Sequence, residues 1–230
     1  MPSQRLPRQP DGHALDWLER GRGRQLLAQT QSMAIPELTR VFGHAGVYLR
    51  PFGDMPAELS GNMLAQVVSL YRQAGRFDGS VRCLDAQWPF SAASLSLVYA
   101  LLVLETSPGP EALMQEISRV LKPEGVALIV SLNPYSPVRL RGSMRGARRF
   151  GRGEIERMVR DAGMEVVRRH FIGPFWASAK APGRVSDGKD RWSDIFRAAG
   201  LLVVRRRESA LTPLRKLAPA ASLRPGMSAG

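Results

Sequence analysis

Apolar positions along this chain fall into short continuous runs that alternate with stripes at helical spacing. The short runs predict strands at residues 47–49, 67–71, 81–84, 95–105, 126–130, 164–171 and 201–204. Helical spacing predicts helices within 14–42, 56–66, 110–121, 153–162 and near 192–199. Strands that alternate with helices predict an α/β fold, in which a doubly wound and mostly parallel sheet carries helices on both faces.

Proline and glycine mark where these elements are expected to end. Pro36 is expected to divide the first helical stretch into two helices, because proline inside a helix removes a backbone hydrogen bond. Asp78-Gly79 predicts a tight turn. Pro110 suits the first turn of a helix, and Gly163 suits the left-handed residue that follows one.

The length of 230 residues allows one α/β domain with tails and a sizeable core. We expect a disordered N-terminus at 1–13, N-terminal helices at 14–44, the α/β domain at 45–208 and a disordered basic tail at 209–230. Apolar runs stay shorter than the roughly 18 residues of a membrane span, and the first residues do not resemble a secretory signal. A cytoplasmic protein is therefore expected.

Cysteine and histidine usage argues against disulfide and metal chemistry. Cys83 is the single cysteine, so an intramolecular disulfide is impossible. The three histidines are scattered along the sequence, and none has the spacing of a metal motif. We therefore expect no metal site.

Basic residues are unusually frequent and are clustered. The formal net charge is +13, and 29 of the 33 basic residues are arginine. One cluster runs from Arg139 to Arg152, and a second spans Arg205–Arg207 and the C-terminal tail. Such clusters either contact nucleic acid or another polyanion, or serve as a solvated face.

One ordered series of motifs carries the most information. Cys83-Leu84-Asp85-Ala86 is followed by Pro89-Phe90, an apolar run, a proline-started helix, the sequence Leu121-Lys122-Pro123-Glu124-Gly125 and a further strand. This order resembles the class I S-adenosylmethionine-dependent methyltransferases with a type 11 domain. The resemblance covers about residues 45–208, and it is greatest to a degenerate, YafS-like proteobacterial subgroup that shares an Asn-Pro-x-Ser turn and a shortened N-terminal half.

The resemblance implies a cofactor site for S-adenosylmethionine, with S-adenosylhomocysteine as product. It implies that Asp85 accepts a hydrogen bond from the adenine amino group and that the backbone N–H of Ala86 faces a ring nitrogen. A carboxylate suits this position, because it can only accept and the amino group can only donate. Gly53 and Asp54 correspond to the loop after the first strand, and Leu104 lies at a strand end beside the same site.

The chain also departs from the family pattern. Leu49 stands where the family has an acid, and Pro51 and Met55 replace two of the three glycines, so only Gly53 survives. Arg72 follows the second strand where the family has a ribose-binding acid. Because 31 residues separate Gly53 from Asp85, the Rossmann-like sheet of the class I methyltransferase type is expected to be shortened between strands 1 and 3. One helix is expected to be lost between strands 2 and 3, with Asp78-Gly79 as a tight connection in its place.

Candidate substrate contacts follow the Leu-Lys-Pro-x-Gly strand. Asn133, Tyr135 and Arg139 are the candidates, and the Asn133-Pro134 sequence is otherwise a turn that leaves the sheet. We assign no catalytic side chain. Three functions stay open: a methyltransferase for an unidentified acceptor, a catalytically inactive methyltransferase-like binding or regulatory module, and a nucleic-acid-binding protein.

Overall fold

The computed structural model describes residues 15–137, 147–151, 153–173 and 196–207. Within these residues one sheet contains the strands β1 (Phe42–Arg50), β2 (Met63–Gln73), β3 (Arg76–Gly79), β4 (Leu95–Leu101), β5 (Leu121–Leu132), β6 (Met164–Ile172) and β7 (Ala199–Arg206). The helices are η1 (Asp16–Glu19), α1 (Gly21–Leu38), α2 (Pro110–Val120) and α3 (Glu154–Asp161). The strand order is β3-β2-β1-β4-β5-β7-β6.

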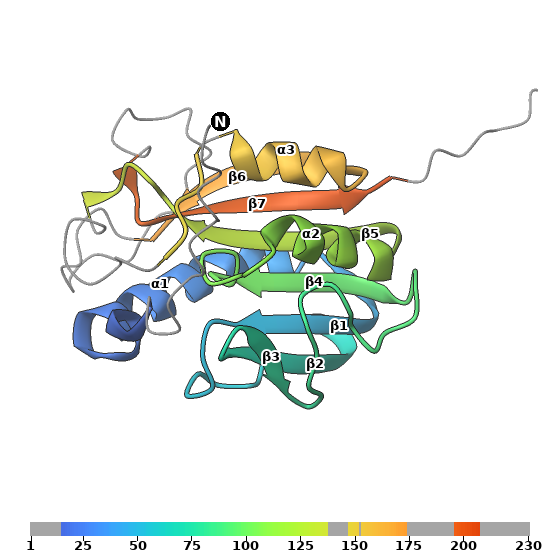
Figure 1. Cartoon of the computed structure of the whole chain (residues 1–230), viewed down its shortest axis with the longest axis horizontal. Coiled ribbons are helices and arrows are strands. Elements are labelled where there is room, and N and C mark those ends of the chain that lie inside the picture. Colours follow the sequence, from blue (N-terminus) through green and yellow to red (C-terminus); the bar gives the residue numbers. More distant parts are fainter. Residues whose placement is uncertain (1–14, 138–146, 152, 174–195, 208–230) are drawn as a thin grey trace, which may run out of the picture.

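The expected α/β sheet is confirmed, and it is mixed. Strands β2, β1, β4 and β5 pair in parallel, whereas β3 and β7 pair antiparallel with their neighbours. The carboxyl ends of the parallel strands share one edge of the sheet, at the left in Figure 1. In open α/β sheets ligands bind at this edge. We call it the carboxyl edge.

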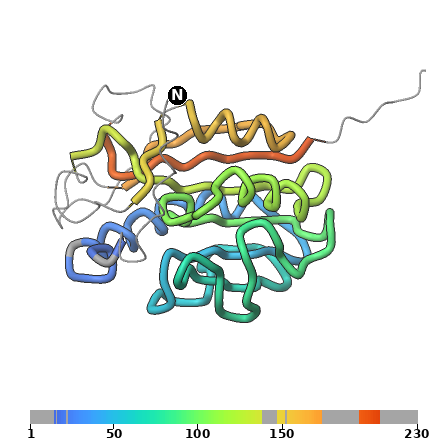
Figure 2. Tube along the Cα trace, in the orientation of Figure 1, coloured from blue at the N-terminus to red at the C-terminus, as the bar shows by residue number. Residues whose placement is uncertain are grey.

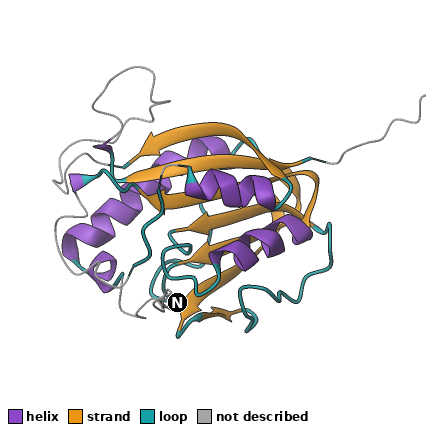
Figure 3. Ribbon diagram, turned by 45° about the horizontal axis from the view of Figure 1, so that its top comes forward, coloured by secondary structure: helices purple, strands orange, loops and turns teal. Residues whose placement is uncertain are grey.

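Helices cover both faces of the sheet, as Figure 3 shows. On one face α1 packs over a buried cluster that includes Tyr48, Tyr99 and Leu128. On the other face α2 and α3 pack over a second cluster that includes Val47, Val98 and Ile129. Neighbouring residues of a strand thus belong to different clusters, because successive side chains of a strand point to opposite faces.

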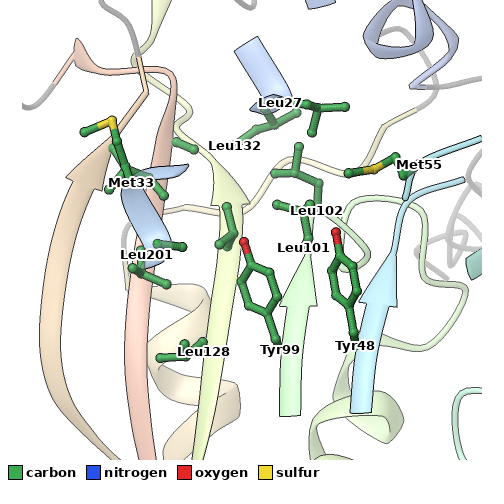
Figure 4. Packing of buried hydrophobic residues seen from close by; sticks show 14 of the residues in the cluster. Leu27, Met33, Tyr48, Met55, Tyr99, Leu101, Leu102, Leu128, Leu132 and Leu201 are labelled. Carbon is green, nitrogen blue, oxygen red and sulfur yellow. The ribbon is translucent and has the colours of Figure 1, made fainter. Parts of the chain in front are cut away.

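Two tyrosines lie at the centre of the α1 face. The rings of Tyr48 and Tyr99 stack with centroids 5.3 Å apart and an interplanar angle of 16°. Figure 4 shows both hydroxyls pointing along the strands toward Met55 and Leu102. Gln31 of α1 donates a hydrogen bond of 3.1 Å to the Tyr48 hydroxyl. This bond ties α1 to the centre of the sheet.

The end of α1 is fixed to β6 by a buried carboxylate. Glu37 pairs with Arg168 of β6 at 2.6 Å and lies 3.2 Å from the His170 ring nitrogen. The expected division of this segment at Pro36 is wrong, since α1 continues to Leu38. The apolar face of α1, which includes buried Leu38, keeps its last turn on the sheet despite the proline.

The connection between β1 and β2 contains no helix, so the helix expected at 56–66 is wrong. Residues 51–62 form turns instead, and Figure 2 shows them as a compact loop. Asn62 organises the end of this loop by donating to the Leu59 carbonyl at 2.6 Å. Gly61 has φ +77°, and a Cβ there would lie 2.7 Å from Ile35 of α1. The loop therefore packs on α1, and Leu59 is buried where a helix would otherwise lie.

The next two expectations are also corrected. Asp78-Gly79 ends strand β3, while the hairpin turn lies at Ala74 and Gly75, with φ +47° and +78°. Two consecutive residues with positive φ match the twist of a hairpin. The strand expected at 81–84 is reduced to isolated bridges, such as Phe77 with Cys83. The shortening between strands 1 and 3 thus affects both connections.

The later elements largely follow the sequence pattern. The predictions of α2, α3, β4, β5, β6 and β7 are confirmed, and Gly163 has φ +73° after α3. Ala199 begins β7, so the helix expected near 192–199 does not include it. Trp192 of that helix and most of the Arg139–Arg152 cluster lie outside the described residues, as do both expected tails.

The segment that follows β3 is held by one carboxylate of α2. Glu116 accepts a 2.6 Å hydrogen bond from the backbone N–H of Trp88. Arg119 donates to the same carboxylate and also to the Phe90 carbonyl. Burial opposes ionisation of Glu116, but the bonds from Arg119 and Trp88 outweigh it and hold the pKa of Glu116 below its usual value.

We expect Glu116→Gln to lower the free energy of unfolding at pH 7 by about 1.5–3 kcal/mol, because bonds to a buried charge are lost. The depressed pKa contributes stability above the unfolded value of about 4.3, and that contribution is lost as the pH falls through the folded value. Urea unfolding at pH 7 and pH 3 measures both effects. Glu111→Gln, an exposed change in the same helix, is the control. An equal loss at both pH values would contradict this role.

Candidate functional site

Asp85 lies at the carboxyl edge in a buried ion pair. Its side chain is 5% exposed, and the Nη1 of Arg72 donates to its Oδ1. Arg72 Nη2 donates to Oδ2 at 3.3 Å, and the Ser107 hydroxyl donates to the same oxygen at 2.5 Å. Both carboxylate oxygens are therefore engaged by other parts of the chain.

Arg72 is placed by the strand pattern and by an aromatic ring. It lies near the end of β2 on the α2 face, and its guanidinium is 3.9 Å from the ring centroid of Phe77 in β3. Its Nη2 also donates to the Val103 carbonyl at 3.4 Å. The side chain thus connects β2, β3 and the end of β4. A guanidinium fork matches a carboxylate well.

The other residues expected to bind cofactor occupy different environments. Ala86 is exposed beside Asp85. Leu104 is fully buried in the core of the α2 face, so it packs inside the domain behind the carboxyl edge. The turn after it begins with a hydrogen bond from Ser107 N–H to the Leu104 carbonyl at 3.2 Å. This turn places the Ser107 hydroxyl on Asp85.

The loop after β1 is organised by an arginine. Arg50 is 5% exposed, and its Nη1 donates to the carbonyls of Gly53, at 3.1 Å, and Met55. Its guanidinium lies 5.5 Å from the ring centroid of Tyr71 in β2. A Cβ on Gly53 would lie 3.2 Å from that same ring, so the close approach at Gly53 is to Tyr71. Asp54 is exposed on the outside of the loop.

Glu105 closes the edge between β4 and β5. It is buried, and its Oε1 accepts a 2.6 Å hydrogen bond from the Leu132 N–H. Its carbonyl accepts a 2.8 Å bond from the Arg148 N–H. Glu105 therefore holds the end of β5 and the segment before α3 against the end of β4.

The candidate substrate residues lie farther along the edge. Asn133 donates to the Arg197 carbonyl at 2.8 Å and accepts from the Tyr135 N–H at 3.1 Å, which is the geometry of a turn. Tyr135 is 57% exposed. It belongs to a groove of about 510 Å³ lined by Pro134, Tyr135, Ser136, Pro137, Arg149, Phe150, Gly151 and Phe196. Arg139 lies outside the described residues.

The structure brings only part of the expected site together. Asp85 and Ala86 lie next to each other, whereas Gly53 lies against Tyr71, on the opposite face of the sheet from Arg72. Tyr135 belongs to a separate groove, and Asn133 forms the turn beside it. Sequence reasoning missed Ser107, Glu105 and the role of Arg50. It treated Arg72 only as a position where the family's acid is missing. An arginine in place of that acid also signals a buried carboxylate partner.

Metal and membrane signals are lacking in the described part of the chain. No group of three or more His, Cys, Asp or Glu side chains there is arranged to hold a metal ion. No helix among the described elements has the length and apolar character needed to cross a bilayer.

The sequence and the fold were compared with those of known proteins. Residues 55–129 match the methyltransferase domain family. An S-adenosylmethionine-dependent methyltransferase from Thermotoga maritima superposes with a TM-score of 0.55 at 15% identity, covering 86% of this chain and 98% of that one. The chain therefore shares its fold with S-adenosylmethionine-dependent methyltransferases, and residues 55–129, a third of its length, match the methyltransferase domain family. The YafS-like subgroup stays an expectation from the sequence.

Two further similarities extend this result. A chain of the Haloferax volcanii complex between the Trm112 methyltransferase activator and a methyltransferase gives a TM-score of 0.52 at 19% identity, covering 84% of this chain and 96% of that one. A 91-residue stretch is 34% identical to the biotin biosynthesis bifunctional protein BioHC of Cellvibrio japonicus. That match spans 36% of this chain and 18% of that protein.

The carboxyl edge of this sheet fits S-adenosylmethionine in part. A carboxylate offers about four acceptor positions, and Arg72 and Ser107 take three of those on Asp85. One position is left for an adenine amino group, but the burial of Asp85 means that Arg72 must give way before the ring can reach it. The loop carbonyls of Gly53 and Met55 are already bonded to Arg50.

We expect Arg72→Met to destabilise the fold by about 3–5 kcal/mol, because Asp85 is left as a buried charge without a counter-charge. Adding Asp85→Leu to Arg72→Met should restore much of the loss. Urea unfolding of the two single variants and the double variant gives the coupling energy. The control is Arg82→Met, which breaks an exposed pair with Asp78 and should cost far less stability. If the stability losses of Arg72→Met and Asp85→Leu simply add up in the double variant, the two residues are not coupled.

Proposed function

We propose that this protein transfers a methyl group from S-adenosylmethionine to an acceptor at the carboxyl edge of the sheet. The observation that carries the proposal is the placement of Asp85. Its carboxylate lies within the stretch that matches the methyltransferase domain family, Ser107 after β4 orients it at 2.5 Å, and the resemblance implies an adenine contact at this residue. The cofactor brings an activated methyl group on a sulfonium sulfur.

The residues have separate tasks under this proposal. Asp85 accepts a hydrogen bond from the adenine amino group, and the N–H of exposed Ala86 faces the ring. Gly53 and Asp54 form the loop beside the cofactor, and Leu104 supports the site from the core. Methyl transfer requires alignment of the two reactants and the exclusion of water more than it requires an acid or a base. We therefore assign no catalytic side chain.

Arg72 sets the strength of cofactor binding in this scheme. Its guanidinium and the adenine amino group are both donors, so they compete for the Asp85 carboxylate. Binding must replace a buried ion pair with a hydrogen bond from an uncharged amino group, which is the weaker of the two interactions. A low affinity for S-adenosylmethionine follows.

The groove beside Tyr135 is the proposed place for the acceptor. It lies after β5, and Arg149 contributes a positive charge to its lining. The Arg139–Arg152 cluster begins next to this groove in the sequence, and the tail adds further basic residues. An acidic acceptor, such as a nucleic acid, complements that charge. Tyr135, Asn133 and Arg139 are the candidates for contact with it.

The Arg72–Asp85 pair also favours a second candidate, a methyltransferase-like binding or regulatory module without catalysis. A domain that no longer binds cofactor gains stability from a partner for its buried carboxylate. The two candidates differ in whether the protein binds cofactor, so a binding measurement distinguishes them.

We expect calorimetry to detect S-adenosylhomocysteine binding to the wild-type protein. Asp85→Asn should lower the affinity about ten- to hundredfold, because a hydrogen bond to a charged acceptor is worth about 1.5–3 kcal/mol. Arg72→Gln should raise the affinity by removing the competing charge. The control is Asp78→Asn, which removes a β3 carboxylate that bonds to Gly79 and Arg82 and not to Arg72.

Two outcomes would decide against this proposal. No heat at millimolar S-adenosylhomocysteine, from a protein that melts cooperatively, would favour the binding module. Binding that Asp85→Asn leaves unchanged would place the cofactor elsewhere.

A further inference from the structure

Arg50 is a buried cation without a counter-charge. It lies at the end of β1 with 5% of its surface exposed, and none of the ion pairs among the described residues includes it. The other buried arginine of this edge, Arg72, is paired with Asp85. An unpaired buried charge is costly, so its presence calls for a physical reason.

The loop contacts of Arg50 account for only part of the side chain. Nη1 donates to the carbonyls of Gly53 and Met55, and this bonding shapes the loop. The Nε of Arg50 is buried and has no hydrogen-bond partner. A neutral donor, such as a glutamine amide, would satisfy the two carbonyls without burying a charge. The Nε donor is left unused by the fold, and the charge meets the Tyr71 ring but no anion.

The neighbours of Arg50 do not supply an anion. The ring of Tyr71 lies beside the guanidinium, and Tyr48, two residues before Arg50 in β1, is on the same face of the sheet. Burial raises the pKa of Tyr48 far above neutrality, although Arg50 and Gln31 partly offset it, so this phenol stays uncharged. Burial also lowers the pKa of Arg50 itself. The acids of the adjoining loop, Asp54 and Glu58, are exposed and do not pair with it.

We propose that Arg50 binds a small oxyanion, a carboxylate or phosphate group, at the carboxyl edge between β1 and β2. The anion pairs with the free part of the guanidinium fork, including Nε, and Tyr71 forms the wall beside it. Because Arg50 is nearly covered by the loop, only a small group or the end of a larger ligand reaches it. The site does not depend on cofactor binding at Asp85, since Arg50 and Arg72 project to opposite faces of the sheet.

Thermal melts with inorganic phosphate or sodium acetate test this site, with sodium chloride at matched ionic strength as the reference. At ten times the dissociation constant, the favoured anion should raise the Tm of the wild-type protein by on the order of 3 °C. The two anions separate a phosphate from a carboxylate preference. Arg50→Gln keeps a donor for the loop carbonyls and should abolish the shift.

Arg76→Gln is the matched control, because it removes the same charge from an exposed position on the β3 hairpin. It should keep the full anion-dependent shift. Equal shifts in Arg50→Gln and wild type, or no shift beyond that of chloride in wild type, would overturn the proposal.

A spectroscopic measurement covers the case in which Arg50→Gln does not fold. The Nε–H resonance of Arg50, assigned from its absence in Arg50→Lys, should move during a phosphate or acetate titration of the wild-type protein. A purely structural role leaves that resonance in place, which would overturn the proposal. A positive result here with no S-adenosylhomocysteine binding would separate this site from the proposed methyl transfer.

Discussion

The buried pair between Asp85 and Arg72 is the interaction on which the N-terminal half of the sheet depends. It joins the end of β2 to a segment that has lost its strand, and Ser107 extends it to the turn after β4. The segment from 80 to 94 forms no ladder with the sheet, so side-chain bonds to Asp85 and Glu116 hold it in place. In this segment, hydrogen bonds to the carboxylates of Asp85 and Glu116 take the place of a regular strand ladder.

Sequence reasoning predicted the elements whose contacts are mostly local or periodic. The helix α2 and the strands β4, β5 and β7 were predicted correctly, because the apolar positions of their sequences are the positions that the fold buries. It failed for residues 56–62, where Leu59 is buried by a loop. Apolar residues at helical spacing can equally line an irregular segment that packs on α1. The sequence does not show that contact.

The candidate site was predictable only in part for a related reason. Asp85 was found because it sits within a series of motifs that share a fixed order. Arg72, 13 residues earlier in the chain, was found only as a gap in the family pattern. Its pairing with Asp85 depends on the hairpin turn at Ala74-Gly75, which the sequence interpretation had placed at Asp78-Gly79. An error in one turn therefore concealed the partner of the central carboxylate.

The helix-free connection between β1 and β2 has a consequence for the dynamics of the protein. A loop closed by a few side-chain bonds can open without unfolding the sheet, because local opening requires less free energy than global unfolding. The 51–62 connection covers Arg50 and contacts Tyr71 through Gly53. Backbone amides of this connection should exchange with solvent well before those of β4, which is buried along its whole length. Access to the carboxyl edge is then governed by a local equilibrium that the rest of the core does not share.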